Sequence, residues 1–70
     1  MTKIAAGMAG NVWKVLVKEG DEVKAGQDVA ILESMKMEIP VVSEFDGTVT
    51  KVNVQEGDFV NDDDTVAEVE

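Results

Sequence analysis

The chain repeats itself at a spacing of about 37 residues, and this repeat limits the folds that are open to it. The best matches pair Val12–Val23 with Val49–Val60, and Val29–Glu33 with Val66–Glu70. Each copy is too short to bury a core of its own. Two copies are also too few for a solenoid, which needs about three repeats. The repeat therefore predicts one globular domain over residues 1–70, with two-fold pseudo-symmetry.

Both copies have the composition of β-strands. Val, Ile and Thr are dense, Gly or Asp clusters interrupt them every 8–12 residues or so, and no stretch keeps a 3.6-residue apolar period. We expect turns at Glu19-Gly20-Asp21 and Glu56-Gly57-Asp58, since glycine accepts a positive φ and the following Asp can bond local backbone. Pro40 should mark a sheet edge or a bulge, because proline cannot donate to a strand ladder.

A third turn is predicted at Asp62-Asp63-Asp64, where the first copy has Ala25-Gly26-Gln27. Three consecutive carboxylates also suggest a Ca²⁺ loop. The segment lacks the spaced ligands and the bidentate Glu of an EF-hand, which favours the turn. We expect no metal site.

The repeat also predicts which side chains face the core. Ala30 and Leu32 correspond to Ala67 and Val69, so we expect them inside, whereas Ile31 corresponds to Glu68 and should be more exposed. This comparison decides the orientation of strand residues that alternation alone leaves open.

The same reasoning applies to the strand around Trp13. Strand alternation puts Trp13, Val15 and Val17 on one face, with Leu16 on the other. The counterpart of Leu16 is Asn53, so the face with Leu16 should point to solvent. We therefore expect Trp13 to lie in the core or to be partly buried.

Charge and composition exclude several functions. The chain has a formal net charge of −9, no cysteine and no histidine. A negative chain is a poor ligand for nucleic acid or for anionic membranes. Zinc sites, disulfides and His-based triads need residues that are missing. No apolar run approaches the roughly 20 residues of a membrane span, and residues 1–4 do not resemble a signal peptide. We expect a cytoplasmic, non-catalytic protein that is monomeric.

Lys36 stands between the two copies, in Glu33-Ser34-Met35-Lys36-Met37-Glu38. Strand-like residues flank Met35-Lys36, which predicts a tight hairpin with the lysine at its exposed tip. An isolated surface lysine is usually only solvated, and a Met pair is more often partly buried than a recognition surface. The position at the pivot of a symmetric domain favours an attachment point instead.

At these residues the chain resembles the biotinyl/lipoyl attachment family, in particular the biotin carboxyl carrier type. The resemblance covers the repeat, the Gly-Asp turns and Met35-Lys36-Met37. It implies a flattened β-barrel of two four-stranded antiparallel sheets, a barrel-sandwich hybrid. It also implies biotin joined to Lys36 by an amide, with Met35 and Met37 favouring biotin as the modification.

Some residues depart from the biotin type. Ser34 replaces a usual Ala, and Glu33-Ser34 also occurs before lipoyl lysines, where a Glu three residues and a Gly sixteen residues ahead of the lysine aid ligase recognition. Glu33 and Gly20 match both positions. A lipoyl arm therefore stays open as an alternative, although Met37 replaces the Ala that usually follows a lipoyl lysine.

The resemblance also predicts the loops. Gly7-Met8-Ala9-Gly10 should form a loop beside the hairpin, paired by symmetry with Glu44-Phe45-Asp46-Gly47. Some bacterial carriers insert a protruding thumb in the first copy. Here Val17-Lys18-Glu19-Gly20 runs directly into the turn, so no thumb is expected.

The function that the resemblance implies is a swinging-arm carrier. The arm on Lys36 would move a carboxyl group from a biotin carboxylase to a carboxyltransferase, after attachment by a biotin-protein ligase. For a lipoyl arm, the partners would be a lipoate ligase and an acyl-transfer complex. A third hypothesis is an inert β interaction module whose lysine is never modified.

Overall fold

The computed structural model describes residues 2–70, and this range contains eight β-strands and no helix. None of the described residues forms a helix suited to crossing a membrane. The strands are β1 (Thr2–Ala5), β2 (Gly10–Val15), β3 (Glu22–Val23), β4 (Asp28–Ser34), β5 (Met37–Val42), β6 (Gly47–Val52), β7 (Phe59–Val60) and β8 (Thr65–Val69).

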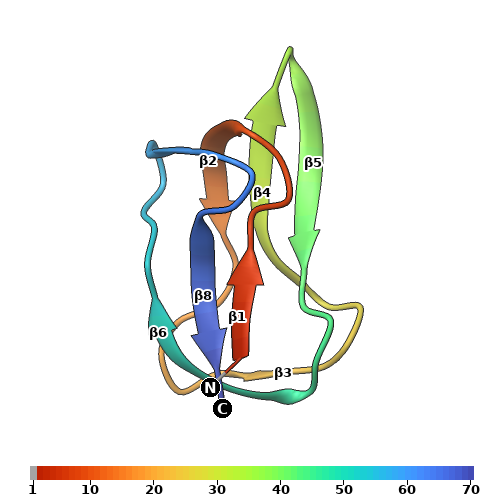
Figure 1. Ribbon diagram of the computed structural model, residues 1–70, viewed down its shortest axis with the longest axis vertical. Helices are drawn as coiled ribbons and strands as arrows, with labels where there is room; N and C mark the ends of the chain where they lie inside the picture. Colours follow the sequence, from red (N-terminus) through yellow and green to blue (C-terminus); the bar gives the residue numbers. More distant parts are fainter. Residues whose placement is uncertain (1) are drawn as a thin grey trace.

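The strands form two four-stranded antiparallel sheets, as predicted. One sheet has the order β1-β8-β6-β3 and the other has β5-β4-β2-β7. A shift of four strands converts the first order into the second, so each sheet combines strands from both copies of the repeat. Neither four-stranded sheet can therefore form from one copy alone. Figure 1 shows the two layers side by side, with the β4–β5 hairpin projecting at one end.

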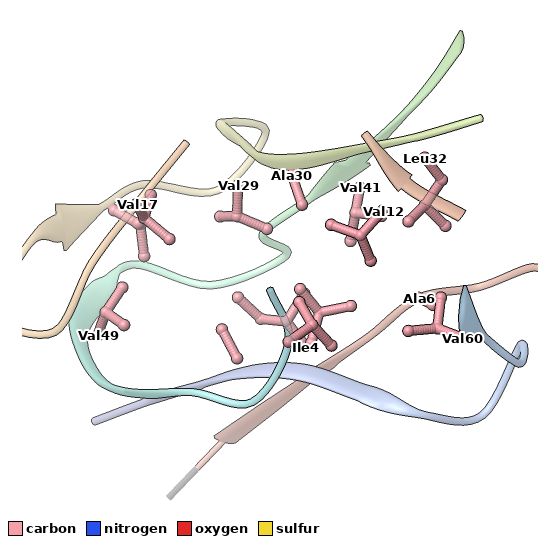
Figure 2. Packing of buried hydrophobic residues seen from close by; sticks show 14 of the residues in the cluster. Ile4, Ala6, Val12, Val17, Val29, Ala30, Leu32, Val41, Val49 and Val60 are labelled. Atoms are coloured by element: carbon pink, nitrogen blue, oxygen red, sulfur yellow. The ribbon is translucent and has the colours of Figure 1, made fainter. Parts of the chain in front are cut away.

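The core lies between the sheets, and its residues recur at the 37-residue spacing of the repeat. Figure 2 shows its apolar side chains filling the space between the two layers. The buried side chains of residues 2–70 fall into eight pairs at the 37-residue spacing: Ile4/Val41, Ala6/Ser43, Val12/Val49, Val17/Val54, Val23/Val60, Val29/Val66, Ala30/Ala67 and Leu32/Val69. The predicted places of Ala30 and Leu32 in the core, and of Leu16 outside it, are confirmed.

Ser43 is the one polar member of this set, and its bonding is local. Its hydroxyl donates to the Phe45 carbonyl at 2.6 Å and accepts from the Phe45 N–H at 3.2 Å. A buried hydroxyl without partners would destabilise the fold. Ser43 is thus accommodated by the turn that follows it.

Trp13 does not lie on the inward face with Val15 and Val17, as strand alternation had predicted, because β2 contains a bulge. Val12 lies opposite Leu32, but the next pair is Lys14 with Ile31, so Trp13 is an extra residue in the ladder. An extra residue reverses the alternation of faces beyond it. Val12 therefore points inward, Trp13 and Lys14 point outward, and Val15 returns toward the core. Trp13 is 44% exposed.

The predicted turns are confirmed, and each is closed by a side chain. Gly20 and Gly57 have φ of 92° and 97°. Asp21 accepts a hydrogen bond from the Lys18 N–H at 3.0 Å, and Asp58 accepts one from the Gln55 N–H at 2.9 Å. These bonds fix the two equivalent turns in the same conformation.

The acidic run Asp62-Asp63-Asp64 also forms a turn. The Asp64 carboxylate accepts a hydrogen bond from the Asn61 N–H at 2.8 Å, as the Gln27 side chain does from the Lys24 N–H in the first copy. Among residues 2–70, no group of three or more His, Cys, Asp or Glu side chains is placed to hold a metal ion.

Pro40 was predicted to mark a sheet edge or a bulge, and the structure places it at an edge. Pro40 lies in β5, which is an edge strand, so its missing N–H removes no hydrogen bond between inner strands.

The link between β2 and β3 consists of residues 16–21, and it has the same length as residues 53–58 between β6 and β7. This link is too short for a protruding thumb, as predicted.

Candidate functional site: the Met35-Lys36 hairpin tip

The turn between β4 and β5 has an unusual backbone conformation. Ser34 lies opposite Met37, leaving Met35 and Lys36 as a two-residue turn. Both have positive φ, 53° at Met35 and 65° at Lys36. Two positive φ values define a type I′ turn, whose twist matches that of the flanking strands. Side chains other than Gly, Asn or Asp are unfavourable there, by about 1–2 kcal/mol per residue.

The strain at this turn lies where the side chains are most exposed. Met35 is 92% exposed and Met37 is 63% exposed. Lys36 between them is also exposed. Residues held in strained conformations gather at functional sites, where the surrounding structure enforces them. Nothing in the packing of the core requires Met or Lys at these positions.

The tip lies at the end of the molecule opposite the chain ends, as Figure 1 shows. The pseudo-symmetry explains this placement. Thr2 lies opposite Val69 in the same way that Ile39 lies opposite Leu32. The ends of the chain therefore take the place that the hairpin turn holds in the other half. The turn that holds Lys36 therefore lies at the opposite end of the molecule from residues 2 and 70.

Below the tip, the outer face carries a row of paired residues. Glu33 of β4 lies between Glu38 of β5 and Asn11 of β2. Both carboxylates are exposed. Like charges directly opposite each other destabilise a sheet by a few tenths of a kcal/mol or more. Folding alone does not favour the Glu33–Glu38 pair, which lies close to the exposed lysine.

Gly10, at the start of β2, packs against the hairpin, which bears out this end of the loop predicted over residues 7–10. Gly10 has no room for a side chain, because a Cβ there would lie 2.9 Å from the Glu33 carbonyl oxygen and 3.5 Å from the Ser34 Cβ. Its counterpart Gly47 is equally confined, since a Cβ there would lie 2.7 Å from the Glu70 carbonyl oxygen. The backbone of β2 therefore supports the hairpin directly.

The sequence predicted the place of Lys36 but not the backbone of its turn. Asn-Gly or Asp-Gly are the usual signals of a type I′ turn. Met35-Lys36 contains no such signal. The positive φ values of these two residues are therefore a finding of the structure alone.

Comparison with known proteins identifies this arrangement. A family described as "Biotin-requiring enzyme" matches residues 1–69. The chain belongs to the biotin/lipoyl attachment family. Within this family, the chain is 56% identical over 66 residues to the biotin/lipoyl attachment protein of Bacillus subtilis (strain 168), covering 94% of this chain and 90% of that protein. The predicted family is thereby confirmed.

Two further relatives show the range of this family. A biotinylated protein homologue of Mycobacterium leprae is 42% identical over 64 residues, covering 91% of this chain and 90% of the relative. In the crystal structure of Kluyveromyces lactis urea carboxylase, a segment superposes on 99% of this chain with a TM-score of 0.91 and 35% identity, and it makes up 6% of that enzyme. The same attachment fold thus occurs in small proteins and inside a large carboxylase.

Proposed function

We propose that this chain is a biotin carboxyl carrier whose Lys36 bears a covalently attached biotin. The observation that carries the proposal is the exposed Lys36 on a strained hairpin tip in a member of the attachment family. Relatives support biotin, since one is named a biotinylated protein and another is a urea carboxylase. The 70 residues would form a single attachment domain.

The residues at the tip fit the attachment chemistry. An amide forms when the neutral Lys36 amine attacks an activated carboxyl carbon, loses a proton and expels the activating group. Such an attack needs an accessible amine, which an exposed turn provides. Biotin, once bound, supplies the ring nitrogen that accepts a carboxyl group. The chain itself presents the arm and is not an enzyme.

A rigid domain with a flexible arm suits a carrier. Tethering replaces the encounter with a free intermediate by an intramolecular one, at roughly millimolar effective concentration for a short flexible link. The core shared by both copies keeps the hairpin in place while the arm moves. A biotin carboxylase and a carboxyltransferase would be visited in turn, with the carrier acting as a monomer in the cytoplasm.

The neighbours of Lys36 are proposed to guide a biotin-protein ligase. Met35 and Met37 flank the lysine with flexible apolar side chains, which adapt well to a partner surface. Glu33 adds charge at the row below the tip, and Ser34 lies opposite Met37 at the base of the turn. These four residues would distinguish the target lysine from the others in the chain.

The proposal can be tested by modification in vitro. Unmodified protein is incubated with biotin, ATP and a purified biotin-protein ligase, and in parallel with lipoate, ATP and a lipoate ligase. We expect one biotinyl group, mapped to Lys36 by fragmentation. Exclusive lipoylation would replace biotin by the alternative arm, and modification by neither ligase would contradict the carrier function.

Met37→Ala is expected to lower the rate of biotinylation at limiting protein concentration by about tenfold, the equivalent of about 1.4 kcal/mol of lost recognition. Met37 is 63% exposed, so its removal should leave stability within about 0.5 kcal/mol of the wild type. The measurement is the specificity constant of each ligase for wild type and variant. Unchanged constants for both ligases would show that this methionine is not a specificity element. Val42→Ala, on β5 but at the far end of the strand from the tip, serves as control.

A further inference from the structure

The two sheets share one backbone plan but differ on their outer faces. Four apolar side chains on the outer side of β4, β2 and β7 and on the link that follows β2 make up what we call the apolar face: Trp13, Leu16, Ile31 and Phe59. Pro40 and Val42 of the edge strand β5 are exposed as well. The residues 37 positions away, on the sheet β1-β8-β6-β3 or its connections, are Thr50, Asn53, Glu68 and Glu22. Every apolar residue of the face is thus matched by a polar one.

The members of the apolar face lie on adjacent strands, with Leu16 held beside β4 by a hydrogen bond from its N–H to the Val29 carbonyl at 2.9 Å. Ile31 lies opposite Lys14, and Trp13 precedes Lys14 at the bulge. The Lys14 ammonium lies 5.4 Å from the centre of the Trp13 ring, so it caps the indole without covering it. Trp13, Leu16 and Phe59 remain 44%, 48% and 61% exposed.

The apolar face is continuous with the hairpin. Phe59 lies opposite Asn11, which lies opposite Glu33, which lies opposite Glu38. These four residues form one cross-strand row immediately below the tip. Strand β4 itself supplies both Ile31 of the apolar face and the first arm of the hairpin.

The fold does not require this apolar face. At the equivalent positions of the other sheet the same backbone carries polar side chains: the Asn53 amide donates to the Glu68 carboxylate at 3.3 Å, and the Thr50 hydroxyl donates to the Glu68 carbonyl at 3.2 Å. The second copy of the repeat is thus an internal control for what folding needs. Clustered exposed apolar side chains that folding does not need are typical of interaction surfaces.

We propose that the apolar face is the docking surface for the biotin-protein ligase that acylates Lys36. The inference rests on the proposed function and adds a recognition surface on one side of the hairpin. A ligase must bring its active site to the tip, so a surface that starts one row below it falls within the same contact. Glu33 and Glu38 at its upper margin favour a basic rim on the enzyme. A second copy of this chain is a poor occupant, because both would carry a net charge of −9.

The test variant replaces two members of the face by their own counterparts, Trp13→Thr with Leu16→Asn. The fold already accepts these residues at positions 50 and 53. The matched control is Thr50→Ala with Asn53→Ala on the opposite sheet. Steady-state biotinylation by a purified biotin-protein ligase is measured against carrier concentration, and a circular dichroism melt checks folding. We expect the test variant to raise KM for the carrier about tenfold with kcat unchanged, and the control to stay within about twofold.

Each outcome decides the proposal. A folded test variant with the KM of the wild type would overturn the docking surface while leaving the carrier function intact. A wild-type chain that is not biotinylated at all would instead remove the proposed function, and the docking surface with it. Sedimentation gives a second readout. A wild type that is dimeric, with a test variant that is monomeric, would assign the face to a second copy and overturn the proposal. A Phe59→Thr variant should repeat the rise in KM independently.

Discussion

Lys36→Arg is expected to abolish biotinylation completely and to leave the fold unchanged. A guanidinium is always protonated in proteins, so arginine offers no free amine to form the amide. Both side chains are exposed cations at this position, and surface substitutions usually change stability by less than about 0.5 kcal/mol. Intact mass after treatment with ligase, biotin and ATP measures the loss, and a thermal melt measures stability.

Lys51→Arg is the matched control for this prediction. It is the same substitution at another exposed lysine, on β6 of the other sheet, and it should be biotinylated like the wild type. Residual biotin on the Lys36→Arg variant would place the attachment point at a different lysine. A lowered melting temperature of that variant would instead mean that the tip contributes to packing.

Leu32→Ala is expected to produce the largest loss of stability from a single side chain. Leu32 is 0% exposed, and it is the largest of the fully buried side chains. Truncating a buried leucine costs about 2–5 kcal/mol, from lost burial and from the cavity left behind. A chain of 70 residues has a total stability of only about 4–10 kcal/mol. The variant should therefore be close to unfolding at room temperature, as urea denaturation would show.

Leu16→Ala makes the same chemical change at an exposed position. Leu16 is 48% exposed, so its truncation should cost less than about 1 kcal/mol. The difference between the two variants isolates burial as the cause. Equal losses for both, or a cost below about 1 kcal/mol for Leu32→Ala, would contradict the assignment of the core.

The repeat was sufficient to predict a single β domain with two-fold pseudo-symmetry and the inward or outward place of several side chains, whereas the two four-stranded sheets were implied by the resemblance to the attachment family. Comparing Ile31 with Glu68 and Leu16 with Asn53 oriented both strands correctly. Trp13 was misplaced because alternation was continued through a bulge. The same register shift occurs in β6, between Val49 and Lys51. The polar counterpart, Thr50, was the signal that would have placed Trp13 outside.

The candidate site was predictable in position and not in conformation. Lys36 at the tip follows from its place between the two copies. The positive φ of Met35 and Lys36 does not, since neither residue favours it. The apolar face was not predicted, because Ile31 and Leu16 were placed outside but Trp13 was placed on the inward face. It emerges only when the outer faces of the two sheets are compared position by position.

The intact mass of the protein purified from its own cells tests the central claim most directly, with fragmentation to locate any added group. We expect one biotinyl group on Lys36 and no modification elsewhere. A lipoyl group at the same residue would instead assign the protein to an acyl-transfer complex. A chain that stays unmodified in its cells, and that both ligases leave unchanged in vitro, would contradict the carrier function altogether.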